Sequence, residues 1–151
     1  AVVSHAGYAY KMSVKVLKEL LARSGGRRGG MLKALMMEYA QTFLVHVSQI
    51  SVCNCRHTLE QRLSRWLLLT FDRLDSTNLS ITHETIGYLL GVRRESITEL
   101  ARKFQLNGII NYRRGHMELK NKLLLEHKAC ECYKTIQQGL YIGKNESKKV
   151  A

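Results

Sequence analysis

The chain has 151 residues, enough for one ordinary domain or for a small domain with an extension. Its 24 Lys and Arg residues outweigh 12 Asp and Glu residues, and the formal net charge of +12 favours a polyanionic partner such as nucleic acid. No apolar run approaches the roughly 18 residues of a membrane span, and the start lacks the features of a signal peptide. The composition therefore predicts a cytoplasmic protein with free thiols and no membrane contact.

Residues 1–30 are predicted to be a remnant of a sensor domain or a flexible segment. Within them, residues 7–12 are a candidate strand and residues 13–22 form a short amphipathic helix. The glycine-rich run 24–30 is predicted to be a linker or loop. The chain contains no Pro, which is consistent with a mainly α fold.

A long helix is predicted within residues 31–56. Along it, a heptad repeat forms one seam, made of Leu32, Met36, Tyr39, Phe43, His46, Ile50 and Cys53. Such a seam joins two parallel chains, so we interpret this segment as a dimerisation helix. An ordinary core helix is the alternative, because the flanking heptad positions lack complementary charges. A second apolar stripe on the same helix requires a second partner.

Residues 57–138 show the order of a helix-turn-helix followed by a wing. A capping box, Thr58 to Gln61, opens one helix, and a Thr82 cap opens a second that stops at Gly91. Gly87 inside this helix indicates close packing. A third helix is predicted over residues 94–106, and residues 109–119 alternate in polarity around a basic turn, as a hairpin does. Residues 79–81 are a candidate third strand, residues 122–138 a closing helix, and residues 139–151 a polar tail.

The helix over residues 94–106 has two distinct faces. Its apolar face carries Ile97, Leu100, Ala101 and Phe104. The opposite face carries side chains suited to hydrogen bonding, namely Arg94, Glu95, Thr98, Glu99 and Arg102. This is the layout of a recognition helix that lies in a DNA major groove. The alternative is a solvated surface helix.

The same residues resemble a known family. The segments EQRLSRWLLL, LSITHETIGYLLGVRRESITELARKFQLNGII and RRGHMEL resemble the winged helix of Crp/Fnr-type bacterial transcription regulators, and ACECY is similar to some members. The resemblance implies a homodimer that binds a pseudo-palindromic site on double-stranded DNA, with RNA polymerase as a candidate further partner. Most of the family's sensor domain has no counterpart here, so the chain is expected to be a fragment or a regulator without its sensor.

The resemblance also implies roles for single residues. By position, Arg94, Glu95 and Glu99 match base-reading residues, and Ser96 matches a phosphate contact. Side-chain chemistry adds further candidates for the base-reading set (Thr98 and Arg102) and for contacts to the DNA backbone (Arg93, Arg113, Arg114 and His116). His83 is expected to contact phosphate or to face water. The sequence departs from the family's pattern at two positions. Glu99 stands where many members have Arg, and Arg93 stands where a Ser or Thr usually caps the recognition helix.

The cysteines form two Cys-x-Cys pairs, Cys53 with Cys55 and Cys130 with Cys132, and His57 and His127 lie nearby in sequence. Both pairs fall in helical patterns, where residues two apart point about 200° away from each other. Neither pair has the spacer of a zinc site, so we predict packing roles, no metal and no cofactor. No catalytic motif is present, which predicts a protein that is not an enzyme. Two alternatives stay open: a dimeric winged-helix module for protein interaction, and a metal- or redox-sensing regulator.

Overall fold

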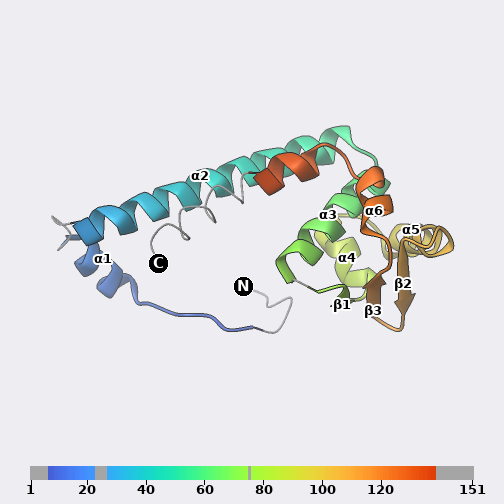
Figure 1. The fold of residues 1–151 in the computed structure, drawn as a ribbon, viewed down its shortest axis with the longest axis horizontal. Coiled ribbons are helices and arrows are strands. Elements are labelled where there is room, and N and C mark those ends of the chain that lie inside the picture. The colour runs from blue at the N-terminus through green and yellow to red at the C-terminus, as the bar shows by residue number, and fades with distance from the viewer. Residues whose placement is uncertain (1–6, 23–26, 75, 139–151) are drawn as a thin grey trace. The chain divides into compact units, whose positions relative to one another are not determined.

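The computed structural model of the chain describes residues 7–22, 27–74 and 76–138 (Figure 1). It divides into two compact units, residues 1–47 with 139–151, and residues 48–138. The mainly α fold with a small antiparallel sheet agrees with the predicted fold class. Within the described residues, no helix has both the length and the apolar character needed to span a membrane.

The first unit contains α1 (Val14–Ala22) and most of α2 (Arg27–Arg56). The short amphipathic helix is confirmed, but the candidate strand over residues 7–12 is wrong because these residues have no regular structure. The linker prediction is wrong from residue 27 onward, where α2 already begins. Propagating an established helix backward through two glycines costs only about 1 kcal/mol for each. Residues 24–26 and the predicted tail over 139–151 lie outside the described residues.

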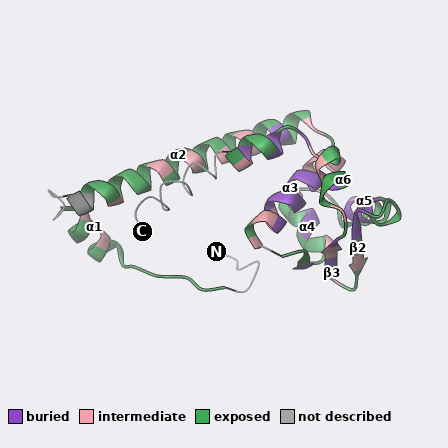
Figure 2. Ribbon diagram, viewed as in Figure 1, coloured by how far each residue is buried: buried purple, intermediate pink, exposed green. Residues whose placement is uncertain are grey.

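The long helix α2 exposes many large apolar side chains (Figure 2). On the predicted seam, Tyr39 and Phe43 are exposed and their rings stack with centroids 6.3 Å apart. Met36 is exposed, and Leu32, His46 and Ile50 are half-buried. Cys53 does not belong to this seam, because its side chain is fully buried against Cys130 and Cys132 within the second unit.

The second unit begins with the end of α2 and with α3 (Leu59–Leu74). The predicted capping box is confirmed: the Thr58 amide donates to Gln61 Oε1 at 3.0 Å, and the Gln61 amide donates to Thr58 Oγ1 at 3.3 Å. Further along the chain lie β1 (Asn78–Ser80), α4 (His83–Leu90), α5 (Arg94–Leu106), β2 (Ile110–Arg113), β3 (His116–Leu119) and α6 (Lys122–Lys128). Their buried side chains form one core, which includes Leu67, Leu68, Ile86, Ile97, Phe104, Ile109, Met117 and Leu125.

The sheet is a small wing with strand order β1-β3-β2, antiparallel throughout. The candidate third strand is confirmed as β1, which pairs with β3. Met117 faces the core from the central strand, paired with Leu79 on one side and Tyr112 on the other. The sheet thus holds the hairpin β2–β3 against the helices.

The predicted closing helix over residues 122–138 is interrupted. The helix α6 ends at Lys128, Ala129 is extended with φ −79° and ψ 157°, and residues 132–138 are helical again. The second helical segment is fixed to α3 by side chains: Tyr133 donates to Asp72 Oδ2 at 2.7 Å, and Gln137 donates to the same oxygen at 3.2 Å. These tertiary contacts outweigh the local preference for one continuous helix.

Candidate nucleic-acid interface and a cysteine–histidine cluster

The turn between α4 and α5 sets how the two helices cross. A Cβ at Gly87 would lie 2.8 Å from the Val92 carbonyl oxygen, so only glycine permits this approach of α4 to the turn. Gly91 ends α4 in the left-handed region with φ 65°, and Thr82 caps its start by accepting from the Thr85 amide. These local features produce the helix-turn-helix that the sequence predicted.

The recognition helix α5 buries one face and exposes the other. Ile97, Ala101 and Phe104 are buried in the core. The predicted base-reading side chains are all exposed: Arg94, Glu95, Thr98, Glu99 and Arg102. Ser96 is half-buried, and Arg93 occupies the N-cap position, where its donor-only side chain makes no capping hydrogen bond to the first turn. Donors and acceptors therefore line one exposed side of the helix.

His83 has a different position from the one we predicted. Its ring stacks on Tyr112 of β2, and its Nδ1 lies 3.0 Å from Thr98 Oγ1 of α5. The Thr98 hydroxyl also bonds to the Arg94 carbonyl oxygen at 3.0 Å. Burial, and to a smaller extent the Arg94 guanidinium, lowers the pKa of His83. His83 thus connects α4, α5 and the wing, and positions them relative to one another.

The tip of the wing is cationic. Arg113 and His116 face each other across a two-residue turn in which Arg114 (φ 49°) and Gly115 (φ 82°) both have positive φ. This is the turn geometry that suits the twist of a hairpin. All three basic residues of the tip are exposed, and His116 Nδ1 lies 3.0 Å from Ser80 Oγ of β1.

Several of the basic side chains near α5 already have carboxylate partners, and others do not. Lys103 binds Glu60 of α3 at 2.6 Å, and Lys120 binds Glu118 at 2.8 Å. The hydrogen bond from Lys103 lowers the pKa of Glu60. Among the residues that the structure describes, none of the arginines predicted to contact DNA forms an ion pair: Arg93, Arg94, Arg102, Arg113 and Arg114. These five guanidinium groups are available to an anionic partner.

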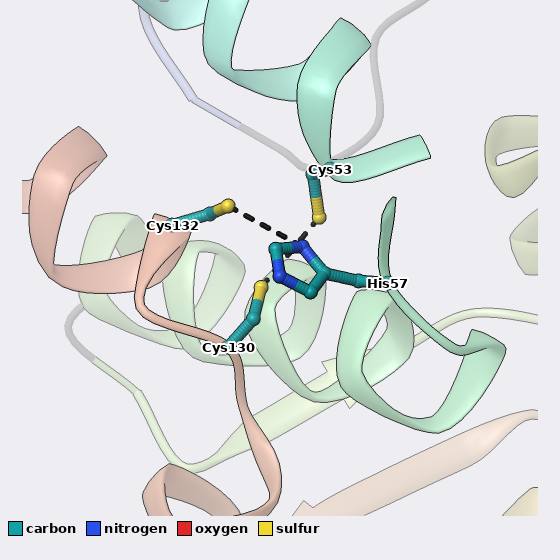
Figure 3. A group of neighbouring side chains, drawn as sticks. All are labelled: Cys53, His57, Cys130 and Cys132. Carbon is teal, nitrogen blue, oxygen red and sulfur yellow. Dashed lines mark hydrogen bonds between the residues drawn. The ribbon is translucent and has the colours of Figure 1, made fainter. Parts of the chain in front are cut away.

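A second constellation lies on another part of the same unit. One ligand atom each from Cys53, His57, Cys130 and Cys132 lies within 4.8 Å of every other (Figure 3). Cys53 Sγ is 3.6 Å from Cys130 Sγ, and Cys132 Sγ is 3.5 Å from His57 Nδ1. Burial raises the pKa of the Cys53 thiol, and burial is also the main cause that raises the pKa of Cys130 to about 12.

This cluster corrects the reasoning behind our prediction for the cysteines. The assumption that both pairs lie on continuous helices is wrong, because Cys130 lies in the break after α6 and Cys132 begins the helical segment that follows it. The relevant pairing is also different. Cys53 lies in the last turn of α2, and His57, four residues further on, directly follows this helix; this spacing places side chains on one helical face. Cys55 is exposed and takes no part. The signal in the sequence was the Cys53-x-x-x-His57 spacing together with the Cys130-x-Cys132 pair, and not the Cys53-x-Cys55 pair.

Comparisons with known proteins agree with the geometry of α4, α5 and the wing. The family described as the Crp-like helix-turn-helix domain matches residues 61–128. The second unit contains a Crp-like helix-turn-helix domain. This match confirms the resemblance to Crp/Fnr-type regulators in this part of the chain. None of the curated proteins matches the chain.

Two solved structures share the fold. One is named as a transcriptional regulator of the Crp/Fnr family from Eubacterium rectale, with 24% identity, a TM-score of 0.52, and coverage of 75% of this chain and 50% of that one. The other is a CRP-family transcriptional regulator from Thermus thermophilus, with 21% identity and a TM-score of 0.51. The match covers 78% of this chain and 55% of that one. The chain therefore spans about half the length of the structures that it matches.

Proposed function

We propose that the chain is a sequence-specific transcription regulator that binds double-stranded DNA as a homodimer, with α5 in the major groove of each half of a pseudo-palindromic site. The observation that carries this proposal is the exposed polar face of α5, backed by a buried apolar face and flanked by a cationic wing tip. A helix held in this way can enter a groove while the core behind it stays intact. The chain's net charge of +12 favours the approach to DNA.

The first turn of α5 is the proposed base-reading end. Arg94 suits a bidentate pair with guanine O6 and N7, and Glu95 suits the amino group of cytosine. Glu99 and Arg102 follow on the same exposed side, one turn and two turns further along. Thr98 has its hydroxyl engaged with His83 and the Arg94 carbonyl, so its proposed contribution is to fix the first turn.

The backbone contacts are proposed from the exposed cations and from Ser96. Arg113, Arg114 and His116 form the tip of the wing, and Arg93 precedes α5 at its N-terminus. Positive side chains at such positions bind phosphates without regard to sequence and set the orientation of the helix.

The proposed dimer contact is the exposed apolar side of α2. Phe43 is 54% exposed and Tyr39 is 72% exposed, although both are large aromatic residues on the predicted seam. Covering such side chains with a second α2 would stabilise the pair by about 1.5–3 kcal/mol for each side chain that becomes fully buried. RNA polymerase as a partner and a cytoplasmic location stay predictions from the sequence.

The test compares two arginines with different proposed roles. Arg94→Ala should cost about 1–3 kcal/mol on the preferred site and relax the choice at one base pair. Arg114→Ala should weaken preferred and random duplexes equally and lower the salt slope of binding by about one unit. Lys103→Ala is the matched control, because it removes the same charge from α5 but Lys103 already binds Glu60. The loss of DNA affinity in Lys103→Ala should be smaller than the loss in either arginine variant.

The measurement is competition binding against a panel of single-substitution sites at two salt concentrations. The same flat loss for both arginine variants would mean that α5 does not read bases. Contacts to phosphates make DNA affinity fall with salt, so duplex binding without any salt dependence would instead favour the alternative of a winged-helix module for protein interaction.

A further inference from the structure

We propose that Cys53, His57, Cys130 and Cys132 bind one Zn²⁺ ion in a closed, tetrahedral site with three sulfur ligands and one nitrogen ligand. The site lies in the second unit, where it joins the end of α2 to the break after α6 (Figure 3). The proposal stands on these four side chains and their neighbours. It is therefore independent of DNA binding by α5.

Two distances between the ligand atoms match the edges of a zinc tetrahedron. With Zn–S bonds near 2.3 Å and Zn–N bonds near 2.05 Å, tetrahedral angles place two sulfurs about 3.8 Å apart and a sulfur and a nitrogen about 3.6 Å apart. The Cys53 and Cys130 sulfurs are 3.6 Å apart, and Cys132 Sγ lies 3.5 Å from His57 Nδ1. Because all four ligand atoms lie within 4.8 Å of one another, one ion at their centre reaches each with small movements.

The neighbours of the cluster have the arrangement that zinc sites require around their ligands. His57 presents Nδ1 to the sulfurs, and its other nitrogen, Nε2, lies 3.2 Å from the Glu131 carboxylate. A carboxylate in this place fixes the ring and makes Nδ1 a better ligand. Cys132 Sγ accepts a hydrogen bond from Gln49 Nε2 at 3.0 Å, which stabilises negative charge on that sulfur.

A buried cation balances the charge of the occupied site. Zn²⁺ with three thiolates and a neutral imidazole carries a net charge of −1. Arg65 of α3 is 3% exposed and acts electrostatically on Cys53, and no carboxylate of the described residues forms an ion pair with it. A buried guanidinium group needs such a counter-charge, and the occupied site supplies it.

The geometry favours one ion over the other uses of cysteine. A disulfide between Cys53 and Cys130 would engage only two of the four side chains and leave Cys132 and His57 facing it. An iron–sulfur cluster places its ligands around several metal atoms, whereas these four ligand atoms lie within 4.8 Å of one another, close enough to surround a single ion. All four positions around the ion come from the protein, which is typical of a structural zinc site rather than a catalytic one.

The structural consequence is a clip between segments far apart in sequence, because Cys53 and Cys130 are separated by 77 positions. Zinc that binds the folded unit and not the unfolded chain stabilises the folded unit. We expect removal of zinc to lower the melting temperature of the second unit, and to free the residues 129–132 from the end of α2.

The experiment measures metal in the whole chain purified under reducing conditions. Elemental analysis should find about one zinc per chain in the wild type. Exchange with Co²⁺ should give the ligand-field and thiolate charge-transfer absorption of a tetrahedral sulfur-rich site. Cys130→Ser should lose the metal. Cys55→Ser should keep it, because Cys55 lies on the same helix as Cys53 but is exposed.

A second variant keeps the test decisive if Cys130→Ser fails to fold. Glu131→Gln retains all four ligands, so it should bind one zinc about 10–100-fold more weakly in chelator competition. Wild-type protein with free thiols that neither contains zinc nor gives the Co²⁺ spectrum would overturn the proposal. Stoichiometric iron with sulfide, a Cys53–Cys130 disulfide in place of metal, or loss of zinc in Cys55→Ser would overturn it as well.

Discussion

The imidazole of His83 stacks on the ring of Tyr112, with centroids 4.0 Å apart and ring planes inclined by 23°. His83 begins α4 and Tyr112 belongs to β2, so this contact joins the helix-turn-helix to the wing. The same imidazole reaches Thr98 in the first turns of α5. One side chain therefore fixes the recognition helix and the wing relative to each other, which is what two surfaces that contact one duplex require.

This position gives His83 a pH-dependent effect on stability. Its Nε2 is buried and has no hydrogen-bond partner among the described residues, and burial lowers its pKa below the ordinary value of 6.5. The unfolded chain therefore takes up this proton at a higher pH than the folded chain. The contribution of neutral His83 to the free energy of unfolding is fully present above about pH 6.5. It is lost as the pH falls from there through the lowered pKa of His83 in the folded state.

Urea unfolding at about pH 7.5 and pH 5.5 tests this dependence. The free energy of unfolding of the wild type should fall between the two values, and His83→Gln should remove part of that fall. His116→Gln is the matched control, because His116 is exposed on the wing and should leave the fall unchanged. Equal pH dependence in all three proteins would show that His83 takes up its proton alike in the folded and unfolded states.

Local signals explain why the helix-turn-helix could be predicted from the sequence. The Thr82 cap, the left-handed Gly91 and the two-residue turn Arg114-Gly115 each depend on residues a few positions apart. The exposed and buried faces of α5 follow from its own periodicity in the same way. The stacking of His83 on Tyr112 could not be predicted, because it depends on how α4 and β2 lie together after folding.

The cysteine–histidine cluster could not be predicted for a related reason. Residues 129–131 contain neither Gly nor Pro, and nothing local marks the end of a helix there. The break depends on tertiary contacts, including those of Tyr133 and Gln137 with Asp72 of α3. If residues 122–138 formed one continuous helix, Cys130 and Cys132 would point to opposite sides of it. In the folded chain, both side chains instead lie with Cys53 in one cluster.

The turn after α4 predicts a large effect of one added methyl group. In Gly87→Ala, the new Cβ would lie 2.8 Å from the Val92 carbonyl oxygen, and both groups belong to the backbone. The turn must shift, so the variant should lose about 1–3 kcal/mol of unfolding free energy despite the better helix propensity of Ala. Gly30→Ala in α2 is the control, because its Cβ meets no described atom within 4 Å.

Chemical denaturation followed by circular dichroism measures both variants. Gly30→Ala should stabilise its helix by up to about 1 kcal/mol. A Gly87→Ala protein as stable as the wild type would mean that α4 can move away from the turn at little cost. The predicted crossing of α4 and α5 would then be looser than the structure indicates.

The apolar side of α2 predicts the behaviour of the chain in solution. Phe43→Glu would place two carboxylates at the centre of the proposed seam, which costs several kcal/mol unless the chains separate. The variant should sediment as a monomer at micromolar concentration. Gln41→Glu adds the same charge two residues away, on the opposite side of α2, and should leave the dimer intact. A dimeric Phe43→Glu protein would show that the seam is misplaced.

The last prediction concerns the acidic residue in the first turn of α5. Glu95 is exposed and brings negative charge toward the phosphates of any duplex. Glu95→Ala should therefore strengthen binding to random DNA, because a repulsive charge is lost. It should also relax the choice at one base pair, because an acceptor for the cytosine amino group is lost.

Glu84→Ala separates these two effects. Glu84 lies in the first turn of α4 and is also exposed, so the variant removes the same charge without touching the proposed base-reading residues. It should strengthen binding to every duplex in the panel by a similar factor and leave the order of preference unchanged. If Glu95→Ala gives this same uniform gain, then Glu95 acts only through its charge, and the base preference must come from Arg94, Glu99 and Arg102.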